Sequence, residues 1–94
     1  MDFILNLFMK MAGNKTRDGL KLTKIVRALL TLPGIEIREG GKHPYVAHMT
    51  GYNQPCPIAT STDARRMVVP WICRATEHKD SERVYLALRE GGWK

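Results

Sequence analysis

Hydrophobic residues recur at helical spacing in two long segments of the chain, and each segment ends near glycine or proline. Residues 20–32 are predicted to form a helix, because an apolar face lies opposite a face rich in lysine and arginine. Residues 81–90 are predicted to form a second helix, with Asp80 or Ser81 as its N-cap and Gly91 after its end. The apolar side chains of this second helix, expected to face a sheet, are Val84, Ala87 and Leu88.

A third apolar segment, residues 2–11, also has helical spacing, with Asp2 as a candidate N-cap. It predicts a helix that packs on the domain or on a second copy of the chain, the latter giving a homodimer. A partner-binding helix and an unattached tail are the alternatives. Residues 12–19 are polar and predict a linker, so residues 1–19 would form an extension and residues 20–94 the folded domain. The apolar segment is too short to span a bilayer and lacks the features of a signal peptide, so a cytoplasmic protein without membrane contact is expected.

Between the two longer helices, two short segments alternate between apolar and polar residues, which is the pattern of a strand with one buried face. Residues 35–38 and 45–49 are therefore predicted to be strands. The glycine pair Gly40 and Gly41 lies between them and favours a turn, so we expect an antiparallel hairpin.

A third strand is predicted at residues 67–69, where Pro70 suits a strand end or a sheet edge. Residues 51–66 are predicted to be an irregular connection, because prolines flank Cys56 within them. The resulting fold class is α+β: a two-layer α-β-β-β-α sandwich in which a three-stranded antiparallel sheet has both helices on one face. The other sheet face would be open to solvent or to a ligand.

The charge of the chain is strongly positive for its length. Fifteen lysines and arginines accompany nine aspartates and glutamates, which gives a net charge of +6. Such a basic domain favours a polyanionic partner, most commonly nucleic acid. Cys56 and Cys73 lack the spacing of a metal site and are expected to be reduced thiols. The sequence also has no glycine-rich nucleotide-binding motif, so neither a cofactor nor a metal is expected.

His43 is the leading candidate for catalysis, because it follows a glycine pair and Lys42 at the entry to a predicted strand. Glycines let the backbone approach a phosphate closely, lysine adds positive charge, and imidazole can exchange a proton near neutral pH. His48 is expected to face away from the core, either as an ordinary exposed strand residue or as part of a binding face. His78 is expected to be a solvated loop residue.

Cleavage of RNA requires few catalytic groups from the protein, because RNA supplies its own nucleophile, the 2′-hydroxyl. One base, with cations that hold the phosphate, could then cleave the strand without a metal. For the arginines among these cations, ordinary surface charge is the alternative. The candidate RNA-binding cations are Lys42, Arg38, Arg65, Arg66 and Arg74. The candidate residues for stacking on bases are Tyr45, Tyr52 and Trp71, with core positions favoured for Tyr45 and Trp71.

Three short motifs occur in the same order as the predicted elements. They are Gly41-Lys42-His43 at the second strand, Val69-Pro70 at the end of the third, and residues 85–92 in the last helix. Together with the order of the elements, these motifs resemble the HicA toxins, the small mRNA interferases of HicA–HicB toxin–antitoxin pairs. In that family the corresponding motifs are Gly-Ser-His, Val-Pro and a helix that ends in Ala-Gly. The resemblance covers the chain from about residue 20 to residue 93.

The resemblance implies a double-stranded-RNA-binding-like fold, metal-independent cleavage of mRNA, and a HicB-like antitoxin as a partner. It also implies that His43 is the catalytic residue. Two departures lie next to this histidine: Lys42 replaces the usual serine, and Pro44 stands where the family often has a second histidine.

Two other functions remain compatible with the sequence. One is a non-catalytic nucleic-acid-binding module on the same fold, in which His43 is incidental. The other is a protein–protein adaptor that recruits an acidic partner through the N-terminal helix and an open sheet edge.

Overall fold

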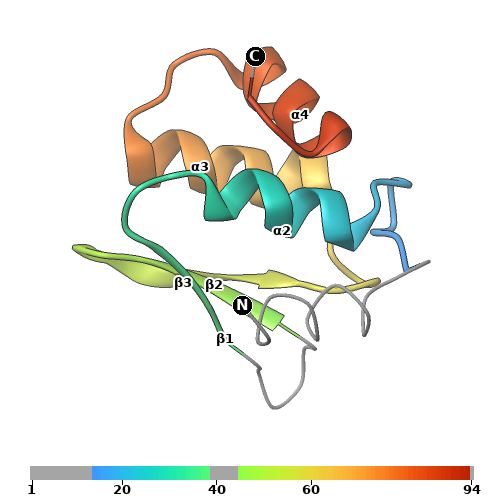
Figure 1. The fold of residues 1–94 in the computed structure, drawn as a ribbon, viewed down its shortest axis with the longest axis horizontal. Coiled ribbons are helices and arrows are strands. Elements are labelled where there is room, and N and C mark those ends of the chain that lie inside the picture. The colour runs from blue at the N-terminus through green and yellow to red at the C-terminus, as the bar shows by residue number, and fades with distance from the viewer. Residues whose placement is uncertain (1–13, 39–44, 94) are drawn as a thin grey trace.

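The computed structural model describes residues 14–38 and 45–93, which form an α+β fold (Figure 1). A three-stranded antiparallel sheet, with strand order β1-β2-β3, is covered on one face by helices (Figure 1). In chain order, the described elements are α2 (Leu22–Leu30), β1 (Ile35–Arg38), β2 (Tyr45–Met49), β3 (Tyr52–Ile58), the π-helical turn η1 (Ala64–Val68), α3 (Val69–Thr76) and α4 (Ser81–Glu90).

Both helices that the apolar spacing predicts within this part of the chain are confirmed. α2 buries its apolar face, including Ile25 and Leu29, while Arg27 on the opposite face is exposed. α4 begins after Asp80, whose side chain accepts a hydrogen bond from the backbone N–H of Arg83 at 3.1 Å. It ends at Gly91, whose φ of 83° is the left-handed conformation that glycine adopts without strain.

The first two strands also lie where the sequence predicts them. Glu36 of β1 lies opposite His48 of β2, and Arg38 lies opposite Val46. Successive side chains of a strand point to opposite faces, so Ile37 is buried under the helices while these four residues lie on the other face. We refer to Glu36, Arg38, Val46 and His48 as the open sheet face.

The third strand is β3, and the prediction of an irregular connection over residues 51–66 is wrong for its first half. Pro55 and Pro57 are tolerated within this strand, because β3 lies at the edge of the sheet and its outer side forms no ladder. The register of its pairing with β2 also shifts between Ala47 and Met49, a local irregularity of the kind at which proline is found.

Residues 67–69 are helical, so the prediction of a third strand there is wrong. They span the junction of η1 and α3. Asp63 is the N-cap of η1, and its side chain accepts a hydrogen bond from the backbone N–H of Arg66 at 3.1 Å. Pro70 lies in the first turn of α3, a position at which proline is common because its fixed φ suits the start of a helix. The pair Val69 and Pro70 therefore opens a helix and does not end a strand.

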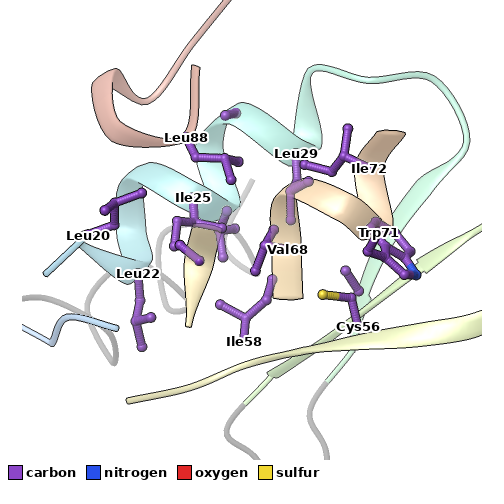
Figure 2. Close-up of a cluster of buried hydrophobic side chains, with 14 of the residues drawn as sticks. Leu20, Leu22, Ile25, Leu29, Cys56, Ile58, Val68, Trp71, Ile72 and Leu88 are labelled. Carbon is purple, nitrogen blue, oxygen red and sulfur yellow. The ribbon is translucent and has the colours of Figure 1, made fainter. Parts of the chain in front are cut away.

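The hydrophobic core fills the space between the sheet and helices α2 and α3 (Figure 2). α4 packs on α2 and α3, which lie between it and the sheet (Figure 1). The sequence predicts that the buried side chains of α4 face the sheet. They face other helices instead, because α2 and α3 lie side by side on the sheet face (Figure 1). Fully buried members of the core include Leu22, Ile25, Leu29, Ile58, Val68, Ile72 and Leu88.

Residues 14–19, which the sequence predicts to be a linker, are hydrogen-bonded to the domain. The backbone N–H of Leu22 donates to the carbonyl of Asn14 at 3.0 Å, and that of Arg17 donates to the carbonyl of Thr62 at 2.9 Å. Thr16 is buried. The folded unit therefore includes this segment as well as the residues from Leu20 onwards.

Candidate nucleic-acid interface

The two leading sequence candidates, Lys42 and His43, lie outside the described residues. The described chain stops at Arg38, the last residue of β1, and resumes at Tyr45, the first residue of β2. Tyr45 lies opposite Ile58, the last residue of β3. Both ends of the segment that carries His43 therefore join the sheet at one end, beside the C-terminus of β3.

Arg38 lies at this end of the sheet and is bound to Glu36. Its guanidinium donates two hydrogen bonds to the two carboxylate oxygens, at 2.7 and 3.2 Å. These hydrogen bonds and the charge of Arg38 lower the pKa of Glu36, with a smaller contribution from the charge of His48. Both side chains of the ion pair are exposed, so the pair contributes little to stability and a phosphate could replace the carboxylate at small cost.

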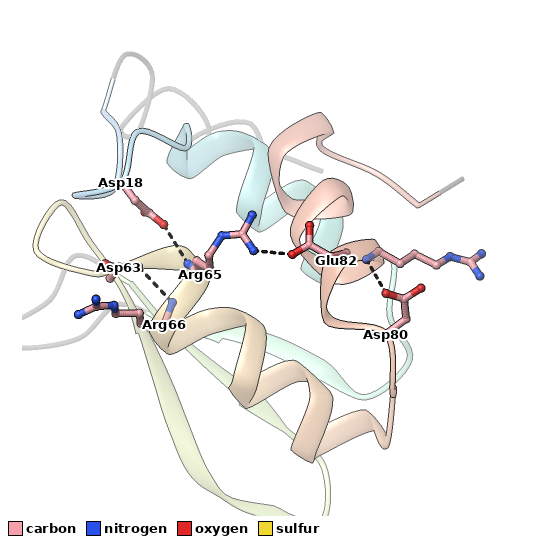
Figure 3. A network of polar contacts seen from close by, with 7 residues as sticks. Asp18, Asp63, Arg65, Arg66, Asp80 and Glu82 are labelled. Atoms are coloured by element: carbon pink, nitrogen blue, oxygen red, sulfur yellow. Dashed lines mark hydrogen bonds and ion pairs between the residues drawn. The ribbon is translucent and has the colours of Figure 1, made fainter.

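The exposed side chain of Arg65 contacts α4 (Figure 3). Its guanidinium donates to Glu82 at 2.6 Å and lies 3.9 Å from the centre of the Tyr85 ring. The hydrogen bond to Glu82 raises the pKa of Arg65. Since both partners belong to α4, this arginine connects η1 to the last helix, and binding a phosphate would compete with these contacts.

The backbone N–H groups at the N-terminus of η1 are already occupied by carboxylates (Figure 3). Asp18 accepts hydrogen bonds from the backbone N–H groups of Ala64 and Arg65, both at 2.9 Å. Asp63 accepts one from the backbone N–H of Arg66 at 3.1 Å. A helix N-terminus commonly binds anions, but these two side chains already fill that role. A phosphate bound at this surface would therefore be held by side chains.

Asp18 has a markedly lowered pKa. Partial burial favours its protonated form, but hydrogen bonds from the Thr16 hydroxyl and from the two backbone N–H groups outweigh burial and lower the pKa from 3.8 to about 2. Because the folded-state pKa lies below the ordinary value, ionised Asp18 stabilises the fold above pH 3.8. This stabilisation is lost as the pH falls from there through about 2.

Replacing Asp18 with alanine is expected to lower the free energy of unfolding by about 1–2 kcal/mol at neutral pH, the usual cost of losing a helix cap. Urea denaturation measures this loss, and the difference from the native protein should shrink as the pH falls to about 2. Asp80→Ala, which removes a single hydrogen bond at the start of α4, is the matched control with a smaller expected loss. A difference for Asp18→Ala that stays the same at both pH values would contradict the linkage.

Arg66 and Arg74 line one groove, which we call the arginine groove. Its volume is about 470 Å³, and it lies between β3 on one side and η1 and α3 on the other. The two arginines are eight residues apart, which spaces them along the helical wall by on the order of 10 Å. No aspartate or glutamate lines the groove. The lining residues are Gln54, Pro55, Cys56, Pro57, Arg66, Met67, Trp71 and Arg74.

Aromatic and polar contacts hold the two walls of the arginine groove together. Trp71 donates from its indole N–H to the carbonyl of Gln54 at 2.7 Å. Arg74 donates from Nε to the Tyr52 hydroxyl at 3.0 Å, and the Tyr52 and Trp71 rings meet edge to face at 6.2 Å. Among the described residues, the terminal nitrogens of Arg74 and the guanidinium of Arg66 have no carboxylate partner. These groups are therefore available to an anion in the groove.

The groove offers charge but no flat aromatic surface. Trp71 and Tyr45 are 2% and 3% exposed, which confirms their predicted core positions. The Tyr52 ring is half-buried against Trp71. Burial raises the pKa of the Cys56 thiol to about 12 despite the nearby charge of Arg74, so this thiol is protonated and unreactive. Of the three residues proposed to stack on bases, Tyr45 and Trp71 are thus too deeply buried to do so.

The two described histidines have different surroundings. His48 lies on the open sheet face, as predicted, and is half-buried opposite Glu36. His78 is not fully solvated, contrary to expectation. Its ring centre lies 5.4 Å from that of Trp93, and its Nδ1 accepts a hydrogen bond from the backbone N–H of Asp80 at 3.3 Å. These contacts fix the loop before α4 and give His78 a structural role.

The described residues contain no group of three or more histidine, cysteine, aspartate or glutamate side chains that could hold a metal ion. None of the helices in this part of the chain is long and apolar enough to cross a bilayer. Comparisons of the chain with protein-family models, with curated proteins and with solved structures gave no match. The arginine groove and the open sheet face adjoin at Pro57, which lines the groove and pairs with Val46.

Proposed function

We propose that the protein binds single-stranded RNA in the arginine groove and cleaves it. The observation that carries this proposal is the presence of Arg66 and Arg74 in one groove without a carboxylate among its lining residues. Two guanidinium groups along one wall can each contact a phosphate of the same strand. The net charge of +6 would attract the strand over a longer range.

Cleavage in this proposal follows the resemblance to the HicA toxins. His43 takes the proton of a 2′-hydroxyl, which then attacks the adjacent phosphate. Arg66 and Arg74 hold the flanking backbone, so that the protein supplies position and charge while the RNA supplies the nucleophile. The chain would then act as an mRNA interferase with a HicB-like antitoxin as its partner.

The arrangement of the chain supports a double-stranded-RNA-binding-like fold as part of this proposal. A helix, a three-stranded antiparallel meander and a final helix follow one another in the order that the resemblance implies. η1 and α3 are additions between the third strand and the final helix. They contribute Arg66, Met67, Trp71 and Arg74 to the groove, so the proposed RNA-binding surface depends on these additions.

Salt dependence of RNA binding tests the role of the arginine groove. Each phosphate contact on a single strand contributes about −0.7 to the slope of log K against log salt concentration. Arg66→Ala and Arg74→Ala are each expected to reduce the magnitude of that slope by about 0.7, and the double variant by about 1.4. Fluorescence anisotropy with a labelled single-stranded RNA, measured over a range of salt concentrations, gives these slopes.

Arg65→Ala is the matched control, because Arg65 neighbours Arg66 in sequence but is bound to Glu82. It is expected to leave the slope nearly unchanged. Equal slopes for the native protein and the double variant would exclude the arginine groove as the RNA-binding surface. Tight, salt-dependent binding without strand scission would favour the non-catalytic module.

A further inference from the structure

The two arginines of the arginine groove differ in how their side chains are held. Nε of Arg74 donates a hydrogen bond to the Tyr52 hydroxyl at 3.0 Å, a contact that joins α3 to β3. Among the described residues, no side chain is hydrogen-bonded to the guanidinium of Arg66, and only its backbone N–H is bound, to Asp63. The groove therefore presents one arginine whose direction is fixed by a neighbour and one whose direction is not.

Tyr52 itself has a fixed place in the fold. It is the first residue of β3 and lies opposite Met49 of β2. Its ring is half-buried and meets the Trp71 ring edge to face, with the ring centres 6.2 Å apart. Trp71 is buried and is fixed in turn by its hydrogen bond to the carbonyl of Gln54. The Tyr52 hydroxyl is thus an acceptor that the sheet and the core hold in place.

The hydrogen bond to Tyr52 determines which donors of Arg74 remain for a ligand. A guanidinium is planar, with one N–H on Nε and the others on its two terminal nitrogens. The bond at Nε therefore restricts the orientation of the plane and leaves both terminal nitrogens unused by Tyr52. Two such nitrogens match two oxygens of one phosphate, the bidentate arrangement that arginine commonly forms. Arg74 lines the groove, whose lining residues include no carboxylate, so a phosphate meets no competing acid there.

The contact between Tyr52 and Arg74 is better suited to orienting a side chain than to stabilising the fold. The hydrogen bond is exposed, so water competes for both groups and its net contribution to folding is modest. An arginine side chain has many rotamers, and immobilising such a side chain on binding lowers affinity. Because Tyr52 already restricts these rotamers in the free protein, less conformational entropy is lost when Arg74 binds a phosphate.

We propose that Tyr52 is a positioning residue for RNA binding: its hydroxyl orients Arg74, so that the two terminal nitrogens of the guanidinium bind one phosphate of the strand. This inference rests on the proposed function and identifies the better prepared of the two phosphate contacts in the arginine groove. Arg74 consequently contributes more to affinity than Arg66, although each arginine neutralises one phosphate. Tyr52 acts through Arg74 and does not contact the RNA itself.

Tyr52→Phe tests this assignment, because it keeps the ring against Trp71 and removes only the hydroxyl. In fluorescence anisotropy with the labelled single-stranded RNA, its affinity should fall by about 2–10-fold, the usual entropic effect of immobilising one long side chain. The slope of log K against log salt concentration should stay at the native value, because Arg74 still neutralises its phosphate. In an Arg74→Ala background, Tyr52→Phe should have no further effect. In an Arg66→Ala background, it should lower the affinity as it does in the native protein.

Tyr85→Phe is the matched control, because the Tyr85 ring contacts Arg65, an arginine outside the groove. It should leave both the affinity and the slope unchanged, and circular dichroism checks that both variants are folded. Native affinity for Tyr52→Phe would overturn the role of Tyr52 alone. An equal loss in the Arg74→Ala background would do the same, because the hydroxyl would then act independently of Arg74. If the double variant Arg66→Ala, Arg74→Ala keeps the native slope, the proposed binding in the groove fails, and the role of Tyr52 with it.

Discussion

Replacing Trp71 with alanine is expected to lower the free energy of unfolding by about 3–5 kcal/mol, which is typical for truncating a buried tryptophan. Its ring is 2% exposed and meets the edge of Tyr52. Its indole N–H also donates to the carbonyl of Gln54 at 2.7 Å, a contact that joins α3 to β3. In a domain whose total stability is of the order of 5–15 kcal/mol, this loss would reduce the stability substantially, and urea denaturation would measure it.

Two further variants separate packing from hydrogen bonding at Trp71. Trp71→Phe keeps most of the buried ring but removes the N–H donor, so it should cost about 1–3 kcal/mol, the penalty of an unpaired acceptor and a smaller ring. Trp93→Ala removes a similar hydrogen bond, to the carbonyl of Ala28 at 3.2 Å, from a ring that is only half-buried. It should therefore cost less than Trp71→Ala. A larger loss for Trp93→Ala would contradict the central position of Trp71 in the core.

The sequence predicts α2 and α4 because their signals are local: apolar spacing with a period of 3.6, the cap at Asp80 and the terminating Gly91. The sequence predicts no strand at β3 and predicts a strand at the start of α3, because local signals favour the wrong structure at both places. Prolines argue against a strand unless its edge position is known, and two adjacent valines, Val68 and Val69, favour a strand when taken alone. These valines instead continue a helical run that begins with η1, where Asp18, distant in sequence, accepts hydrogen bonds from the first turn.

The incorrect prediction of a connecting loop at residues 65 and 66 also limits prediction of the candidate site. Arg65 and Arg66 are adjacent in sequence, and a connecting loop would give them similar surroundings. On a helical turn, neighbouring side chains point in different directions, so Arg65 contacts Glu82 while Arg66 lines the arginine groove. Gln54 and Met67 line the groove as well, but they carry no sequence signal, because the groove exists only once β3 and η1 lie side by side.

His43→Ala is expected to reduce the rate of RNA cleavage by about 10²–10⁴-fold, the usual contribution of a general base. The physical reason is that a 2′-hydroxyl is a weak nucleophile unless its proton is removed during the attack. His43 follows a glycine pair and Lys42, in a segment that joins the sheet at Arg38 and Tyr45. Cleavage of a uniformly labelled transcript, followed in the presence of a chelator, measures the rate.

His78→Ala is the matched control for this prediction, because His78 is a histidine held by Trp93 and the backbone of Asp80. It should change stability slightly and cleavage little. Binding of RNA by His43→Ala should remain close to that of the native protein, since Arg66 and Arg74 hold the strand in the groove. If the variant loses both cleavage and binding, His43 belongs to the binding surface, and its loss is no evidence that it acts as a base. A variant that keeps full cleavage would show that His43 is not the base.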